Sequence, residues 1–206
     1  MAFIRTIPVE QAQGDVRAMY ERTQAGPGYV PNYAKIFSHR PQVMAAWSAL
    51  LSSIRGNLET RQYELITLAA ARALRSSYCM LAHGRVLREK FYSASQLTAI
   101  AADFAHADLT PSEVAMMTFA ERVARDTTAI TDAEVQSLRE HGLTDAQIFD
   151  IAAAAAARCF FSKLVDALGT LPDAALGELE DDLKHELTRG RPISTERPER
   201  VPPAPP

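Results

Sequence analysis

Three side chains that could do chemistry together lie within the stretch Glu64 to His83, ELITLAAARALRSSYCMLAH: Ser76, Cys79 and His83. If Ser76 or Ser77 caps a helix beginning here, their spacing places all three on one helical face. Cys79 would then lie in the first turn, where unpaired N–H groups and the helix dipole favour a thiolate. His83, one turn later, can accept the thiol proton. The stretch therefore predicts a nucleophile with its base.

Other interpretations of the same residues stay open. Free cysteine packs as a small hydrophobe, so Cys79 could be a buried structural thiol. Cysteine and histidine at this spacing can also both bind zinc. A structural zinc site needs four ligands, however, and no second Cys/His pair stands at ligand spacing, so we expect no metal. The second cysteine, Cys159 in RCFFSKL, is expected to belong to the core.

The stretch resembles the motif of the alkylhydroperoxidase D / carboxymuconolactone decarboxylase family. Its redox members show a Glu, eleven residues, Cys-x-x-Cys, and His after three more. Counted from Glu64, these positions fall on Ser76, Cys79 and His83, so a serine replaces the first cysteine. The segments VPNYAKIF at 30–37, LTPSEVAMMTFAERVARD at 109–126 and FFSKLVDALG at 160–169 resemble the peroxidase-related branch. The resemblance covers roughly residues 5 to 175.

The resemblance implies a thiol peroxidase in which the Cys79 thiolate attacks a peroxide and becomes a sulfenic acid. Glu64 would turn inward, hold the His83 ring and favour its charged form within a proton relay. The family's paired cysteines close a disulfide that a dithiol partner reduces, and Ser76 cannot do this. An external thiol, a dithiol partner or Cys159 would have to act instead. The family also implies a homo-oligomer, trimer or hexamer, and no cofactor.

Two alternatives remain for the function. A decarboxylase or isomerase of the carboxymuconolactone type would use His83 as general acid and base without thiol chemistry. A catalytically silent helical oligomer would serve as a binding or structural module.

Composition restricts the partners. The chain has 206 residues, is 47% hydrophobic and 23% charged, and carries a net charge of −3. It therefore offers no basic footprint for nucleic acid. No uncharged apolar run reaches the roughly 18 residues of a membrane span, and MAFIRTIPVEQ lacks the apolar region of a secretory signal. We expect a cytoplasmic protein that binds neither nucleic acid nor membranes. The family resemblance implies a small-molecule peroxide as substrate and a thiol or dithiol as reductant.

Helix punctuation recurs along the chain and predicts an all-α bundle of about seven or eight helices. Four capping boxes begin at Ser93, Thr110, Thr131 and Thr144, and Gly142 and Gly169 are placed to close helices. No alternating β-branched run suggests a sheet. Residues 1–189 are expected to form this helical domain. From 190 to 206 the composition becomes proline-rich, which predicts a disordered tail.

Overall fold

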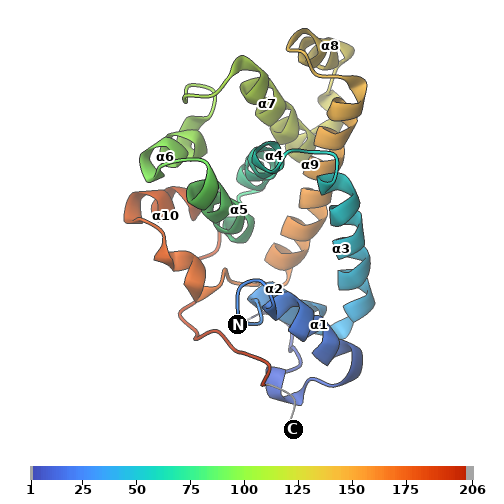
Figure 1. The fold of residues 1–206 in the computed structure, drawn as a ribbon, viewed down its shortest axis with the longest axis vertical. Helices are drawn as coiled ribbons and strands as arrows, with labels where there is room; N and C mark the ends of the chain where they lie inside the picture. The colour runs from blue at the N-terminus through green and yellow to red at the C-terminus, as the bar shows by residue number, and fades with distance from the viewer. Residues whose placement is uncertain (1, 203–206) are drawn as a thin grey trace.

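A nearly fully buried helix, α4 (Thr60–Ala73), lies at the centre of the molecule (Figure 1). The structure is a computed structural model that describes residues 2–202. Helix α4 packs against α5 (Ser77–Lys90), α7 (Pro111–Arg125) and α9 (Asp145–Ala167), so apolar side chains cover almost its whole circumference. A helix enclosed in this way places its polar residues, Glu64 among them, inside the protein.

The prediction of an all-α fold is confirmed. Residues 2–202 contain ten α-helices, somewhat more than expected, and no strand beyond a single bridge between Val30 and Glu199. The remaining α-helices are α1 (Gly14–Gln24), α2 (Asn32–Ile36), α3 (Pro41–Arg55), α6 (Ala94–Asp103), α8 (Asp132–Glu140) and α10 (Asp181–Leu187). Short 3-10 helices span Val9–Gln11, Phe37–His39, Thr127–Ala129 and Ala174–Glu178. None of the described helices has the length and apolar character needed to cross a membrane.

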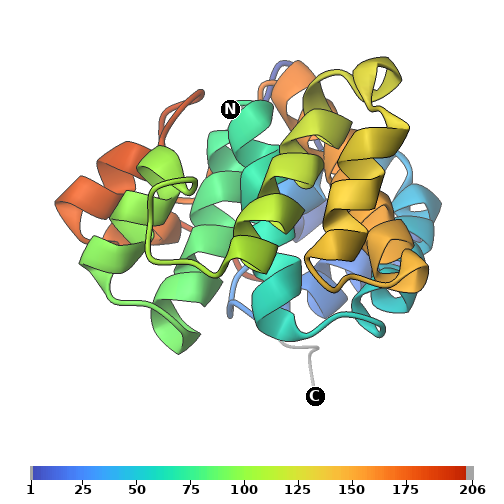
Figure 2. The same cartoon turned by 90° about the horizontal axis from the view of Figure 1, so that it is seen from above.

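The helices form a bundle around one continuous core. Buried apolar side chains from Val9 to Val201 belong to a single cluster. Helix α3 lies alongside α9, and α6 packs on α10 at the opposite edge, as the view from above shows (Figure 2). The cysteine-bearing helix α5 is therefore enclosed between α4, α6 and α10.

All four predicted capping boxes are present. At Ser93, Thr110, Thr131 and Thr144, the hydroxyl accepts from the backbone three residues later, and the Glu or Gln side chain returns the bond. Gly142 and Gly169 have φ values of 86° and 72°, where a residue with a Cβ would be strained. These local signals set the helix ends because they involve only neighbouring residues.

The chain after Arg189 differs from the predicted disordered tail. Residues 190–202 run along the body of the protein to α1, and residues 203–206 lie outside the described part (Figure 1). Val201 is buried, and backbone bonds tie the segment down at four places: Gly190 N–H to Ser77 Oγ at 2.7 Å, Ser194 N–H to the Pro172 carbonyl at 2.9 Å, Val30 N–H to the Glu199 carbonyl at 2.8 Å, and Val201 N–H to Gln24 Oε1 at 2.7 Å. The partners are distant in sequence, so composition alone did not reveal them.

Candidate active site

A sharp break between α4 and α5 sets the position of Cys79. Arg75 has a left-handed φ of 55°, and Ser76 follows as the N-cap of α5 in extended conformation. Helix α5 begins at Ser77, so Cys79 lies in its first turn, as the sequence predicts. The backbone N–H groups of this turn have no partner within the helix, which favours negative charge here. The serine caps only through its backbone, because its side chain makes no capping bond.

The Cys79 sulfur is buried, at 1% exposure, and accepts two hydrogen bonds from α9. Ser162 Oγ donates to Sγ at 3.1 Å, and Arg158 Nη1 donates at 3.4 Å. Arg158 and Ser162 are four residues apart and so lie on one face of the helix. The sulfur therefore faces a hydroxyl and a guanidinium, groups that can donate hydrogen bonds to an anion.

Arg158 is itself buried, at 4% exposure. Burial opposes its charge, but Cys79 and Tyr63 outweigh that effect and raise the pKa of Arg158 above its usual value. Its guanidinium lies over the Phe161 ring, 5.5 Å from the centroid, and its Nε makes no hydrogen bond. No carboxylate within residues 2–202 forms an ion pair with it. The sulfur is thus the group that can balance this cation.

Glu64 turns inward and holds His83, as the family motif implies. Glu64 is 2% exposed, and its Oε2 lies 2.5 Å from His83 Nδ1. A carboxylate can only accept, so the ring donates through Nδ1 and leaves Nε2 as an acceptor. Arg55 Nη2 lies 3.9 Å from the other carboxylate oxygen. The ring orientation is therefore fixed by the packed carboxylate of α4.

The charge state of His83 differs from the expectation. Burial and the Arg158 guanidinium lower the pKa of His83 more than Glu64 raises it. The ring is therefore neutral at neutral pH, suited to accept a proton. No hydrogen bond joins it to the Cys79 sulfur, whose bonding partners are Arg158 and Ser162. The sequence spacing predicted that Cys79 and His83 share one site, but it did not reveal Arg158, which helps to lower the pKa of His83.

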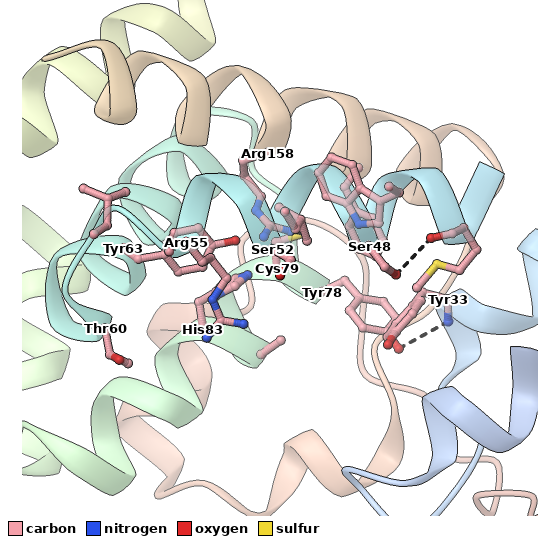
Figure 3. A pocket seen from close by; sticks show the side chains of 17 residues that line it. Tyr33, Ser48, Ser52, Arg55, Thr60, Tyr63, Tyr78, Cys79, His83 and Arg158 are labelled. Atoms are coloured by element: carbon pink, nitrogen blue, oxygen red, sulfur yellow. Dashed lines mark hydrogen bonds between the residues drawn. The ribbon is translucent and has the colours of Figure 1, made fainter. Parts of the chain in front are cut away.

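Cys79 and His83 open on one cavity of about 670 Å³ (Figure 3). In this view, Arg158 points toward Cys79, while Arg55 and His83 lie together toward one end. The lining comprises two cations, the sulfur and imidazole, and mostly aromatic or apolar walls: Tyr33, Met44, Trp47, Ser48, Leu51, Ser52, Arg55, Gly56, Leu58, Thr60, Tyr63, Tyr78, Cys79, Ala82, His83, Arg158 and Phe161. Such a chamber admits a small molecule with an apolar body.

Two other candidate residues, Ser76 and Cys159, are not among the hydrogen-bond partners of the Cys79 sulfur. Ser76 is fully buried, at 0% exposure, and does not line the cavity. Its hydroxyl makes no well-formed hydrogen bond and lies beside Asp166, whose carboxyl pKa is raised by burial and lowered in part by Ser76. Cys159 is half-buried and does not line the cavity, and burial raises the pKa of its thiol.

Tyr78 is part of the cavity wall rather than a reacting group. Its hydroxyl donates a short hydrogen bond to Asp173 and accepts from the Tyr33 N–H at 3.3 Å. Burial, with Asp173 beside it, raises the pKa of Tyr78 well above its usual value, so the phenol stays protonated. Within residues 2–202 no three His, Cys, Asp or Glu side chains gather as a metal site.

Arg158 and Ser162 were missed by the sequence analysis. Both lie about 80 residues beyond Cys79, on the alanine-rich helix, and no local spacing connects them to it. One signal was available: an arginine within the long apolar run AAAAAARCFF must either leave the core or have a partner there.

Comparison with known proteins supports the predicted resemblance. The sequence pattern of the carboxymuconolactone decarboxylase family matches residues 41–122, which include the whole Glu64-to-His83 stretch. No curated protein matches the chain by sequence.

Solved structures share the fold over most of the chain. A peroxidase-related protein with an alkylhydroperoxidase D core from Ralstonia eutropha is 28% identical, with a TM-score of 0.76 over 85% of this chain and 94% of its own. A peroxidase-related protein from a Silicibacter species is 22% identical, with a TM-score of 0.72 over 85% and 91%. The debrominase Bmp8, solved with 2,3,4-tribromopyrrole, is 16% identical, with a TM-score of 0.65 over 84% and 89%. The chain thus has the alkylhydroperoxidase D-like fold and carries the carboxymuconolactone decarboxylase family pattern over residues 41–122, which include Glu64 to His83.

Proposed function

We propose that this protein is a thiol peroxidase that acts through Cys79. The observation that carries the proposal is the sulfur's setting. Cys79 is buried at a helix start and accepts hydrogen bonds from Ser162 and from Arg158, which has no carboxylate partner within residues 2–202. The guanidinium stabilises the thiolate, which is the form that attacks a peroxide. The fold shared with peroxidase-related proteins supports the same assignment.

In the first half-reaction, the thiolate attacks one oxygen of R–O–O–H and the O–O bond breaks. Cys79 becomes a sulfenic acid, and the leaving oxygen takes a proton and departs as R–OH. That proton comes from solvent, and the neutral His83 relays it through Nε2 to the leaving oxygen. Glu64 keeps the ring in the tautomer that leaves Nε2 free. The apolar cavity walls suit a peroxide whose R group is organic.

The test follows the sulfur by intact mass in a Cys159→Ser background. Stoichiometric peroxide should add about 16 mass units, or about 32 on over-oxidation, with loss of the peroxide. Cys79→Ser should show neither change. Persistence of peroxide consumption at the full rate in Cys79→Ser would contradict the proposal.

A Ser76→Cys variant tests the missing second thiol. Residues at i and i+3 in a first turn are within reach of a disulfide after modest relaxation. The variant should lose about two mass units on oxidation and regain them with a dithiol. A loss of two mass units by the native chain, through Cys79 and Cys159, would show instead that a resolving thiol is already present.

A second candidate function is carboxymuconolactone-type acid–base catalysis, favoured by one observation. The neutral His83 ring faces the cavity with Nε2 available, which needs no thiol. Under this function, His83→Gln would abolish turnover of such a lactone while Cys79→Ser would retain it. Loss of peroxide consumption in Cys79→Ser, together with no turnover of the lactone by the wild type, would instead support the peroxidase.

We also propose that the protein is a homo-oligomer, trimer or hexamer. Helix α3 exposes Val43 and Leu50, and α9 exposes Phe149 and Phe160. Exposed large apolar side chains on neighbouring helices are typical of contact surfaces. Light scattering at micromolar concentration should give a mass of three or six chains, and a monomer would contradict this.

A further inference from the structure

The position of the sulfur restricts what can reduce it, and this inference rests on the proposed peroxidase. Cys79 is almost fully buried at the wall of the cavity. Ser76 offers no thiol, and Cys159 lies outside the cavity lining. A reductant must therefore enter the cavity, and a volume of about 670 Å³ admits a small molecule and not a folded protein.

The charges around the sulfur change between the two half-reactions. Arg55 and Arg158 are cations, Glu64 is an anion, and His83 is neutral at neutral pH. With a Cys79 thiolate these charges sum to zero, so the reduced pocket suits a neutral peroxide. Once Cys79 is an uncharged sulfenic acid, the same groups leave one positive charge unbalanced. A buried cation without a counter-ion is costly, so the oxidised pocket favours an anion.

The geometry offers two guanidinium groups to such an anion. Arg158 lines the cavity beside the sulfur, to which its Nη1 donates at 3.4 Å. Arg55 lines the cavity as well, is 52% exposed, and approaches Glu64 no closer than 3.9 Å (Figure 3). Guanidinium groups recognise carboxylates by paired N–H donors. We infer that the reductant is a small monothiol that carries a carboxylate.

The chemistry balances with two such thiols, R–SH. The first attacks the sulfenic sulfur, forms the mixed disulfide Cys79–S–S–R and releases water. A second thiolate attacks the R-bearing sulfur, releases R–S–S–R and returns Cys79 as the thiolate beside Arg158. Each turnover therefore converts one peroxide and two thiols into an alcohol, a disulfide and water.

The experiment compares three two-carbon thiols that differ in charge. Cys159→Ser protein is oxidised to the sulfenic acid, and its reduction is followed with mercaptoacetate, mercaptoethanol or cysteamine. Each rate is divided by the rate of the same thiol with dipyridyl disulfide, which removes differences in intrinsic reactivity. The normalised rate should be about tenfold higher for mercaptoacetate than for mercaptoethanol, and lowest for cysteamine, as expected for one favourable charge contact.

Arg55→Gln should reduce the preference for mercaptoacetate, and Arg55→Lys should restore most of it. Arg55 is half exposed, so both variants are expected to fold. Equal normalised rates for the three thiols would overturn the inference while leaving the peroxidase intact. Faster reduction by a thioredoxin-like protein dithiol than by mercaptoacetate would overturn it also. Failure of peroxide to form any sulfenic acid would overturn the peroxidase itself, and this inference with it.

Discussion

At the scale of residues, Arg158 contacts one candidate catalytic side chain and acts on the other. Its guanidinium donates a hydrogen bond to the Cys79 sulfur, and together with burial it lowers the pKa of His83. The Glu64–His83 pair was predictable, because the family motif implies it and the spacing preserves it. The contacts of Arg158 and Ser162 with the sulfur were not, because they depend on how α9 packs beside α5 in three dimensions.

Replacing Arg158 should slow the reaction of Cys79 with iodoacetamide. In a Cys159→Ser background at neutral pH, Arg158→Met should lower the alkylation rate about tenfold, the equivalent of about 1.4 kcal/mol of lost thiolate stabilisation. Arg158→Lys keeps the charge but not the planar guanidinium, so its alkylation rate should lie between those of the wild type and Arg158→Met. An unchanged rate in Arg158→Met would show that the helix start alone sets the reactivity.

The lowered pKa of His83 predicts how stability depends on pH. The unfolded ring titrates near its usual value of about 6.5, whereas the folded ring titrates lower. Between these two values the unfolded chain binds more protons, so the free energy of unfolding falls as the pH drops through this window. Above about pH 6.5 the His83 ring is neutral in both the folded and the unfolded chain, so the stability associated with its neutral form is fully present.

Urea unfolding between pH 8 and pH 5 checks this expectation against His83→Gln. The wild type should lose more stability than the variant over that interval. A parallel loss in both proteins would assign the pH dependence to other groups.

At the scale of elements, the helix ends could be predicted from the sequence, whereas the ordered path of residues 190–202 could not. Capping boxes and closing glycines act within a few residues, so the four predicted capping boxes and the two predicted closing glycines all formed. The segment from 190 to 202 has little apolar content, and its order comes from hydrogen bonds to Ser77, Pro172, Val30 and Gln24. It passes the first turn of α5, so it also supports the helix that carries Cys79.

Gly190 is the tightest point of that contact. A Cβ at Gly190 would clash with the Arg75 carbonyl, whereas a Cβ at Gly177 would make ordinary contact with Ile193. Gly190→Ala should therefore lower the melting temperature by several degrees, since about 1 kcal/mol corresponds to about 2–4 °C at this chain length. Gly177→Ala is the matched control and should change it little. Equal melting temperatures for both variants would mean that the segment does not hold the helix start.

At the scale of the whole molecule, the all-α architecture follows from the absence of strand patterns and from the recurring caps. The number of helices was slightly underestimated, and the shortest ones, α2 and α10, have five and seven residues. The central place of α4 also depends on packing that no single segment encodes, although its run of apolar and alanine residues indicates burial on every side.

The isolated cation inside this fold has a consequence for heat resistance. If the sulfur's negative charge balances Arg158, the melting temperature of the entire protein should follow the charge on one atom. Breaking a buried pair by removing one partner costs about 3–5 kcal/mol. Cys79→Ser should thus lower the melting temperature of the reduced protein by several degrees.

A double-mutant cycle measured by calorimetry isolates this coupling. Arg158→Met should lower the melting temperature of the wild type, yet leave that of Cys79→Ser unchanged or raise it, because there the guanidinium has no anion to balance. Additive losses would show that the two side chains only pack together. If the two side chains are coupled, peroxide treatment should change the melting temperature. Oxidation of Cys79 to the uncharged sulfenic acid should lower it, and further oxidation to the anionic sulfinate should raise it again.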